Sequence, residues 1–487
     1  SVIIYILNFE PNELVKRGIL MRIKDKKTNE IYYINAVVLM GLFTFLFLGA
    51  EYLYVDVLSE IVSENRTVLA QNYALGVSTV GFLLYPIFNQ ICKGRMKSIS
   101  YFLISGIAAL CMSLICIRKE FMDVFLSGLV LFLIFGLIGS GVFYTSIRML
   151  KTDGCLARTV GIAYSVGILL QFINNNLIQS KSAEAIILSV FLIGLIWRLR
   201  KNESECCKKE QQEEKNFKTE EIKRGHTVGI LLIILVALMT CIFSTLDNAV
   251  TLVHSAGNAN IGQAPRILLA LSGLAAGFIF DIKNRKYMGI TMYCVMVLST
   301  ICIAVMEFSG PFLVGLIVFY LSAGFFAVFF TTGFMEISRY MKVPELWAGM
   351  GRAVNNMIAA LIANSVLGLM SDGSGLVIVI LVLLVFVAVS IISVLYTFQK
   401  NAFMEQLIVN EENEVSEEER LQKFAETFSF TEREREVFTY LINTEDNVQT
   451  IADNLYVSRR TLERYISAIY KKTGTKSRVG LFNLYNK

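Results

Sequence analysis

Long apolar stretches constrain the fold of this chain more than any other feature of its sequence. A helix needs about 20 apolar residues to cross the hydrocarbon core of a bilayer. Twelve stretches of this kind lie near residues 35–55, 68–91, 99–117, 122–147, 157–178, 183–198, 228–250, 264–282, 287–306, 312–337, 347–370 and 375–398. Because lipid cannot satisfy backbone polar groups, these stretches predict an all-α bundle of twelve transmembrane helices.

The composition supports a membrane protein and argues against an enzyme. Only 17% of the 487 residues are charged, compared with about 25% in soluble domains. The nine cysteines are scattered, and the only cluster, Cys206-Cys207, lacks zinc-ligand spacing in a chain with two histidines. We find no nucleophile–base pair and no glycine-rich phosphate loop. We therefore expect no catalytic residues, no metal site and no cofactor.

The distribution of basic residues predicts which ends of the helices face the cytoplasm. Lys and Arg concentrate in short cytoplasmic loops. Basic residues follow the second, fourth, eighth and tenth apolar stretches: Lys93, Arg95, Lys97, Arg148, Lys151, Arg158, Lys283, Arg285, Lys286, Arg339 and Lys342. The alternate loops are poor in net positive charge; Asp56, Glu60 and Glu64 outweigh Arg66 in the first, and Asp372 lies in the last. Both termini are therefore predicted in the cytoplasm, with the bundle in a bacterial cytoplasmic (inner) membrane.

Changes in composition divide the chain into six parts. Residues 199–226 and 410–420 are highly charged, and we expect them to be solvated. Met21 precedes a run of basic residues and is a candidate start, in which case residues 1–20 are not native. The predicted organisation is an N-terminal cytoplasmic segment (1–34), a first six-helix membrane half (35–198), a charged cytoplasmic linker (199–227), a second six-helix membrane half (228–398), an acidic tether (399–423) and a C-terminal domain (424–487).

A spaced motif follows the eighth apolar stretch. Its residues fit Gly-x-x-x-Asp-x-x-x-Arg-Lys: Gly277, Asp281, Arg285 and Lys286. After the second stretch only Gly94-Arg95-Met96-Lys97 is kept, and Asn89-Gln90 stands near the position of the acid. With its six-plus-six organisation, the chain resembles the major facilitator family over about residues 35–398. The resemblance implies a gate on the inward side, in which the Asp pairs with the basic cluster or a helix end. The eroded first copy counts against robust alternating access.

Polar residues within the apolar stretches are candidates for a ligand site, because burying them in a membrane is costly. Glu51 and Asp247 lie at corresponding outer ends of the first and seventh stretches, which resemble cavity-lining helices of the family. The alternative is that Glu51, Asp247 and Arg352 sit near water-exposed helix ends. The further candidates are Tyr52, Tyr144, Gln171, Asn174, Arg352 and Asn355. Asn174-Asn175-Asn176 also fits a helix end that faces water.

The last 64 residues predict a compact domain of four helices. Thr431 and Glu434 have the spacing of a capping box. Val437, Phe438 and Leu441 then follow at helical spacing. A second helix is expected near 448–455, a third with Ser458 as N-cap, and a fourth from about Ser477. Two short helices joined by the tight turn Tyr456-Val457 form a helix-turn-helix. Inward-facing positions are Ile451, Ala452, Leu455, Leu462, Ile466, Ile469, Leu481 and Leu484.

The residue pattern of this domain resembles the LuxR-type DNA-binding domain. The matched positions are Phe430-Thr431-Glu432-Arg433-Glu434-Arg435-Glu436-Val437-Phe438, Ile451-Ala452, Leu455, Val457-Ser458, Thr461-Leu462, Ile469-Tyr470, Lys472, Gly474 and Ser477-Arg478. Departures are the segment 443–447 and Tyr465, where His is common. The resemblance implies base reading by Glu463, Arg464 and Ser467. It leaves phosphate contacts to Arg459, Arg460, Thr461, Lys471 and Lys476, and it implies a homodimer through the last helix, around Val479, Leu481 and Leu484.

Charge favours double-stranded promoter DNA as the partner of this domain. Residues 456–487 contain eight Lys or Arg against one Glu, a net charge of +7. A basic face of this kind suits phosphate binding. The alternatives are a basic surface without DNA and one that meets anionic lipid.

These features predict a membrane-integrated, one-component transcription regulator. The membrane bundle senses an unknown small-molecule effector or a state of the membrane, and the helix-turn-helix binds promoter DNA. The rival hypothesis is a major-facilitator-type transporter whose DNA-binding tail is regulatory.

Overall fold

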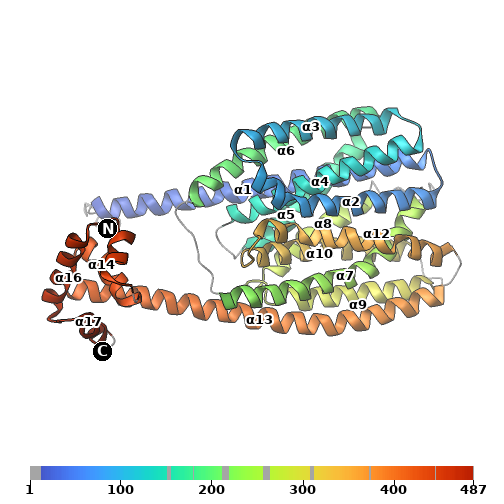
Figure 1. Ribbon diagram of the computed structural model, residues 1–487. Helices are drawn as coiled ribbons and strands as arrows, with labels where there is room; N and C mark the ends of the chain where they lie inside the picture. Colours follow the sequence, from blue (N-terminus) through green and yellow to red (C-terminus); the bar gives the residue numbers. More distant parts are fainter. Residues whose placement is uncertain are drawn as a thin grey trace, which may run out of the picture. The chain divides into compact units, whose positions relative to one another are not determined.

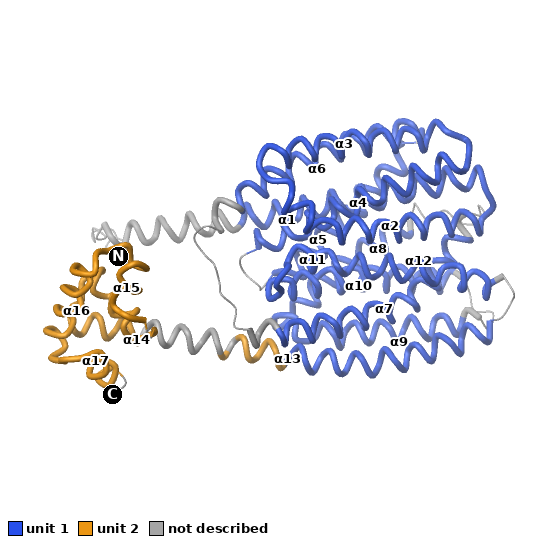
Figure 2. Tube along the Cα trace, viewed as in Figure 1, with its two compact units in different colours: residues 1–401 blue, residues 402–487 orange. Residues whose placement is uncertain are grey.

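The computed structural model describes residues 13–150, 155–178, 180–210, 219–255, 264–307, 312–371, 375–444 and 446–485. Every regular element in these residues is a helix (Figure 1). The chain divides into two compact units, Ser1–Asn401 and Ala402–Lys487 (Figure 2). Residues 1–12, and with them most of the candidate non-native segment, lie outside the described residues, as do Lys151 and Asp372.

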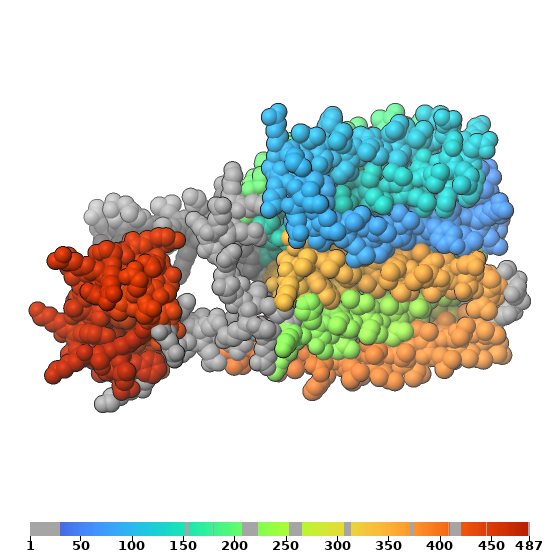
Figure 3. All heavy atoms as spheres, in the orientation of Figure 1, coloured from blue at the N-terminus to red at the C-terminus, as the bar shows by residue number. Residues whose placement is uncertain are grey.

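The first unit contains two sets of helices that correspond to the two predicted halves. The first set is α1 (Glu13–Ser59), α2 (Glu64–Ile91), α3 (Gly94–Ile117), α4 (Phe121–Met149), α5 (Leu156–Leu177) and α6 (Lys181–Glu210). The second set is α7 (Thr219–Ser255), α8 (Ala264–Phe280), α9 (Met288–Glu307), α10 (Phe312–Ser338), α11 (Pro344–Ala348), α12 (Met350–Ser371) and α13 (Gly375–Thr427). Figure 3 shows the two sets as adjoining layers of the bundle.

The bundle has the dimensions of a multi-pass membrane protein. Among the described residues, eleven helices are long and apolar enough to cross a membrane. The eighth apolar stretch forms a shorter apolar helix, Pro265–Phe280, because the chain leaves the helix for a series of turns at Asp281. The all-α membrane bundle is thus confirmed, whereas the count of twelve full spans is not. Large apolar side chains such as Phe102, Leu384 and Phe398 lie exposed on its surface, as lipid contact requires.

The two charged segments that were expected to be solvated linkers are largely helical. The predicted linker 199–227 is helical at both ends, since α6 continues to Glu210 and α7 begins at Thr219; residues 211–218 lie outside the described residues. The predicted tether 399–423 lies wholly within α13. Long charged side chains favour helix, so an acidic composition here does not interrupt α13.

The two halves touch through glycine at the contact of α5 with α8. A Cβ atom added to Gly161 would lie 2.7 Å from both the Gly273 carbonyl oxygen and the Gly277 Cα. A Cβ atom added to Gly277 would lie 2.8 Å from the Ala157 carbonyl oxygen. The backbones therefore meet directly, as small residues permit in membrane helices.

The second unit is the predicted helix-turn-helix domain. Its helices after α13 are α14 (Glu432–Asn443), α15 (Val448–Asn454), α16 (Arg459–Thr473) and α17 (Arg478–Tyr485). The capping box is present: the Glu434 backbone N–H donates to Thr431 Oγ1 at 3.3 Å, and the Thr431 N–H donates to Glu434 Oε2 at 2.7 Å. Ser458 caps α16 as expected, and Gly474 ends that helix in the left-handed conformation, at φ +69°.

The core of this domain begins before residue 424. The expected residues Val437, Phe438, Leu441, Ile451, Ala452, Leu462, Ile469 and Leu481 are all buried. Leu455 and Ile466 pack against this core but remain partly exposed, and Leu484 is half-buried. The end of α13 adds Leu421 to the core, and the Phe424 ring stacks on Phe438 with 4.9 Å between centroids. One helix therefore contributes residues to both units.

Candidate ligand cavity, gate and DNA-binding surface

Polar side chains from both halves of the membrane unit line one cavity. Glu51 of α1, Asp247 of α7, Arg266 of α8 and Arg352 of α12 all contribute to its wall. Its volume of about 180 Å³ is at least tenfold more than the roughly 10–15 Å³ that one water molecule requires. A small molecule can therefore occupy it.

The structure brings some of the candidate ligand residues together and separates others. Glu51, Asp247 and Asn355 line the cavity, as do Tyr52 and Arg352. Gln171 does not line it; its side-chain amide donates to the Leu48 carbonyl at 2.9 Å. The Asn174 amide donates to Glu184 Oε1 at 2.9 Å and is buried rather than facing water. Tyr144 lies beneath the Arg148 guanidinium, with 5.2 Å to the ring centroid.

Sequence reasoning missed several lining residues because single amides and tyrosines in apolar helices stand out less than carboxylates. The further polar lining residues are Gln71, Asn72, Tyr164, Thr240, Ser244, Thr251, Arg266, Tyr320 and Asn356. Arg266 was overlooked because it lies at the start of an apolar stretch, where a basic residue usually marks a helix end. The signal available for the amides was their position one or two helical turns from another polar residue.

Amide hydrogen bonds cross from one half to the other beside the cavity. The Asn72 side chain of α2 donates to Asn248 Oδ1 of α7 at 3.1 Å. Asn356 of α12 donates to Ser78 Oγ of α2 at 2.8 Å. Within the first half, Gln71 donates to Glu51 Oε1 at 2.7 Å. These bonds tie the wall of the cavity to the contact between the halves.

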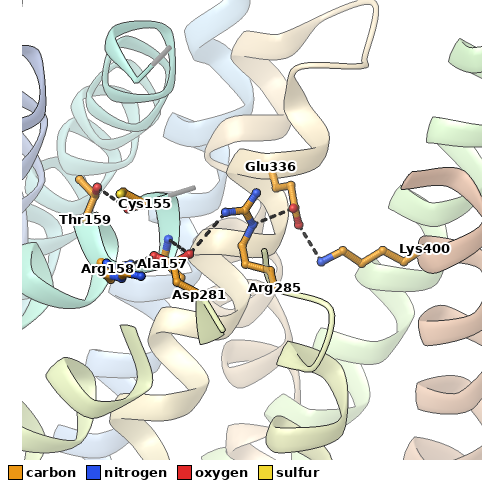
Figure 4. A network of polar contacts seen from close by, with 8 residues as sticks. All are labelled: Cys155, Ala157, Arg158, Thr159, Asp281, Arg285, Glu336 and Lys400. Carbon is orange, nitrogen blue, oxygen red and sulfur yellow. Dashed lines mark hydrogen bonds and ion pairs between the residues drawn. The ribbon is translucent and has the colours of Figure 1, made fainter. Parts of the chain in front are cut away.

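The predicted gate motif forms a network that joins the two halves (Figure 4). Asp281, after α8, accepts hydrogen bonds from the backbone N–H groups of Ala157 at 3.1 Å and Arg158 at 2.8 Å. These groups lie in the first turn of α5, where the helix dipole favours a negative charge. Gly277, one turn earlier, makes the backbone contact with α5 described above. Asp281 therefore holds the end of α8 against the start of α5.

The network continues through Arg285 to α10 and α13 (Figure 4). Arg285 Nε lies 2.7 Å from Glu336 Oε1, and Arg285 Nη1 lies 3.4 Å from Asp281 Oδ1. Glu336 Oε2 forms an ion pair with Lys400 of α13 at 2.7 Å. Lys283, Asn284 and Arg285 all have positive φ, which turns the chain so that Arg285 is 1% exposed. Lys286, the last motif residue, is exposed.

At the corresponding place in the first half, the amide Asn89 stands near the position that Asp281 has in the second. Asn89 of α2 donates to Glu345 Oε1 of α11 at 3.3 Å and accepts from Lys97 at 2.7 Å. Lys97 also pairs with Glu203 of α6 at 2.8 Å. An amide carries no charge for a helix dipole, so Asn89 does not repeat the role that Asp281 has at α5.

The candidate base-reading residues lie on the solvent side of α16. Glu463, Arg464 and Ser467 are exposed, as are Arg459, Arg460, Lys471 and Lys476. Thr461 is half-buried, and its N–H donates to Ser458 Oγ at 3.2 Å. Glu463 forms an exposed ion pair with Arg459 at 2.9 Å. Arg464 thus stands free for a ligand beside a Glu463 that is already paired.

Two other basic residues of this region are structural. The Arg478 guanidinium donates to the carbonyls of Leu441 at 2.8 Å and Asp446 at 2.6 Å, and also to that of Thr444, at the end of α14. Lys472 pairs with Glu434 at 2.6 Å. Burial alone would raise the pKa of Glu434, but its hydrogen bonds with Lys472 and Thr431 bring the pKa below the ordinary value. These two cations stabilise the fold, so we do not count them in the basic surface that is a candidate for DNA binding.

A family profile matches this domain. Residues 428–484 match the family described as "Bacterial regulatory proteins, luxR family". The chain ends in a LuxR-type helix-turn-helix domain. No curated protein sequence matches the chain. The predicted resemblance of residues 430–478 is therefore confirmed by the profile.

Solved structures resemble the membrane part in fold. An auto-inhibited POT family peptide transporter is similar with a TM-score of 0.52 and 9% identity, over 76% of this chain and 96% of that one. The major facilitator superfamily transporter FucP, in the outward conformation, matches with a TM-score of 0.48 and 13% identity, over 75% of this chain and 99% of that one. The membrane unit has a major-facilitator-like fold, and at these identities the likeness extends to the fold alone.

Proposed function

We propose that this protein is a membrane-integrated transcription regulator that binds promoter DNA and responds to a small molecule in its membrane unit. The observation that carries this proposal is a LuxR-type helix-turn-helix on the same chain as a major-facilitator-like bundle with a charged cavity. A helix-turn-helix binds DNA by placing its second helix in the major groove, where side chains contact the bases.

Each exposed side chain of α16 has a distinct role in this account. Arg464 donates two hydrogen bonds to a guanine, and Glu463 accepts from cytosine once it leaves Arg459. Ser467 is the third base-reading residue. Arg459, Arg460, Thr461, Lys471 and Lys476 grip phosphates, which position the domain without reading sequence.

We propose that the domain forms a homodimer on a two-fold DNA site through the last helix, α17. The residues that pair differ in part from those expected from the sequence. Leu481 belongs to the core and is fully buried. Val479 and Phe482 of α17 are 70% and 46% exposed. We place the pairing surface on these two side chains.

Coupling between ligand and DNA rests on α13. Lys400 anchors α13 to Glu336, and through Arg285 and Asp281 to the first turn of α5. The same helix ends at Thr427, after Leu421 has entered the core of the DNA-binding domain. A ligand that binds two arrangements of the halves with different affinity changes the pairing of Lys400 and so biases α13.

The basic loops support a cytoplasmic location for both termini, in the inner membrane of a bacterium. This is the side on which the domain meets the chromosome. One of these loops contains the candidate gate residues Asp281 and Arg285, so we propose that the gate lies on the cytoplasmic side.

A transporter with a regulatory tail is the second candidate, and the fold likeness to transporters favours it. Asn89 in place of a carboxylate counts against it, because the first-half contact lacks the charged lock of Asp281. Purified protein in liposomes separates the two. Binding of a solute without uptake supports the sensor, and sustained uptake of that solute supports the transporter.

DNA binding is tested on residues 402–487, which include Leu421 and Phe424 of the domain's core. We expect salt-dependent binding to DNA from upstream of its own gene, and loss of sequence preference in Arg464→Ala. Equal, weak binding of both proteins to every duplex would overturn the DNA-reading role.

A further inference from the structure

Four charged side chains share the membrane cavity, and their charges balance. Glu51 and Asp247 supply two carboxylates, and Arg266 and Arg352 supply two guanidinium groups. Glu51 comes from the first half, whereas the other three come from the second. Four charges within a membrane-embedded wall are expensive unless something compensates each one.

These charges do not compensate one another by direct pairing. Among the residues that the structure describes, no ion pair within 4 Å joins any two of the four, whereas such pairs form elsewhere in the same bundle. The Nε atoms of Arg266 and Arg352 are buried without a hydrogen-bond partner. Glu51 holds one neutral partner, Gln71. The four charged side chains thus surround the same cavity without forming ion pairs with one another.

Aromatic rings of the wall hold one of these groups, the Arg352 guanidinium, in position. The Arg352 guanidinium lies 5.4 Å from the ring centroids of both Phe47 and Phe330, which belong to opposite halves. Such contacts fix a cation without neutralising it. Phe243 and Phe326 stack beside the cavity with 4.4 Å between centroids and offer an apolar surface.

A purely anionic ligand would satisfy the arginines and leave two carboxylates desolvated, and a purely cationic ligand would do the reverse. A molecule with one group of each sign satisfies both without adding net charge. The aromatic wall suits an apolar group on the same molecule. We propose, as a refinement that rests on the proposed sensing function, that the cavity binds a small zwitterion of the amino-acid type, with its ammonium toward Glu51 and Asp247 and its carboxylate toward Arg266 and Arg352.

The test uses one molecular scaffold in four charge states. Full-length protein in detergent, without DNA, is titrated with L-phenylalanine, its amide, its N-acetyl derivative and its N-acetyl amide. The same series is repeated with leucine, and binding is measured as the shift in Tm. We expect at least one of the two free amino acids to bind on the order of tenfold more tightly than its three derivatives. Equal or tighter binding of the cationic or anionic derivative, or no shift in either series, would overturn the proposal.

Two paired variants test the assignment of the charges. Glu51→Gln with Asp247→Asn should shift the preference toward the N-acetyl anion. Arg266→Gln with Arg352→Gln should shift it toward the cationic amide. Because the preference is a ratio measured within each variant, a general loss of stability does not imitate it. Glu64→Gln, at an exposed helix start, is the control and should keep the zwitterion preference.

The outcome separates this inference from the regulator proposal. If the zwitterion binds but the DNA affinity of the full chain does not change, the proposed ligand class stands and the proposed sensing function is wrong. DNA affinity that responds to the N-acetyl anion or the amide, but not to the free amino acid, would do the opposite. Unchanged preference ratios in both paired variants would overturn the assignment of the four side chains.

Discussion

The membrane unit and the C-terminal unit place their charged side chains differently. In the network that joins the two halves, Asp281, Arg285 and Glu336 are each at most 5% exposed, and each contacts another charged group or a helix terminus. On α16, Arg460, Arg464 and Lys471 point into solvent. Arg285 is thus part of the fold of the membrane unit, whereas Arg464 of the C-terminal unit is free for a partner.

This difference follows from the surroundings of each charge. A charge buried in an apolar bundle is costly unless something compensates it, and around Asp281 the compensating charges belong to the protein itself. A charge on a soluble surface gains little from pairing and is available to a polyanion. Substitutions in the network around Asp281 should therefore change stability, and substitutions on α16 should change binding.

The largest effect is expected for Arg285→Gln. It leaves the Glu336 and Asp281 carboxylates in a buried site with one cation fewer, which costs about 3–5 kcal/mol. The measurement is the Tm of the full-length protein in detergent. Lys286→Gln, the exposed neighbour, is the control and should change it little. A similar Tm for both variants would mean that the network does not hold the halves together.

Gly277→Ala should be the next most costly change. Its Cβ would lie 2.8 Å from the Ala157 carbonyl oxygen and 2.9 Å from the Gly161 Cα, both backbone atoms. Overpacking of this kind costs roughly 1–3 kcal/mol. The control is Gly194→Ala, at a helical glycine with nothing within 4 Å. Full-length variants compared by thermal unfolding should show a loss for the first alone. Equal behaviour of the two would argue against the backbone contact.

Two arginines of the C-terminal unit sharpen the comparison within one domain. Arg478→Ala removes the donor to several carbonyls at the end of α14 and should destabilise residues 402–487 by roughly 2 kcal/mol. Arg464→Ala should leave the free energy of unfolding unchanged and cost about 1–3 kcal/mol in binding to the preferred DNA. Urea unfolding and DNA titration of both variants measure this. If Arg478→Ala weakened only DNA binding and Arg464→Ala lowered only stability, the roles assigned to the two arginines would be wrong.

The smallest effect is a pH dependence from Glu434. Its pKa is lowered in the folded domain, so its contribution is present above the unfolded pKa and is lost as pH falls through the folded pKa. Residues 402–487 should therefore lose stability as the pH falls from the unfolded pKa, about 4.3, through the lower pKa of the folded domain. Glu434→Gln should be less stable at neutral pH and should show a shallower acid dependence. An unchanged acid dependence in this variant would rule out Glu434 as its source.

The sequence predicted the two units to different depths. In the C-terminal domain, Thr431, Ser458 and Gly474 act locally, through caps and turns, so the elements followed from short spacings. In the membrane unit, hydropathy predicted where helices lie but not which faces meet. The pairing of Asp281 with the N–H groups of Ala157 and Arg158 joins residues more than 120 positions apart. No local pattern contains that contact.

Prediction of the candidate cavity from the sequence has the same limit, because local patterns do not show which distant segments pack together. Glu51 and Asp247 were recognisable because carboxylates are rare in apolar stretches, and both line the cavity. Gln171 carried the same kind of signal, yet its amide satisfies the Leu48 carbonyl instead. Whether a buried amide serves a helix contact or a cavity depends on packing between distant segments.

The most direct test of the proposed DNA-reading role is selection of DNA by the full-length protein in lipid nanodiscs. Random duplexes are bound, recovered and sequenced, for the unaltered protein and for Arg464→Ala. The account predicts an enriched motif with two-fold symmetry, bound on the order of a thousandfold or more above random duplex. In the variant, the preference for one guanine in each half-site should disappear. An unaltered protein that enriches no motif would contradict the account.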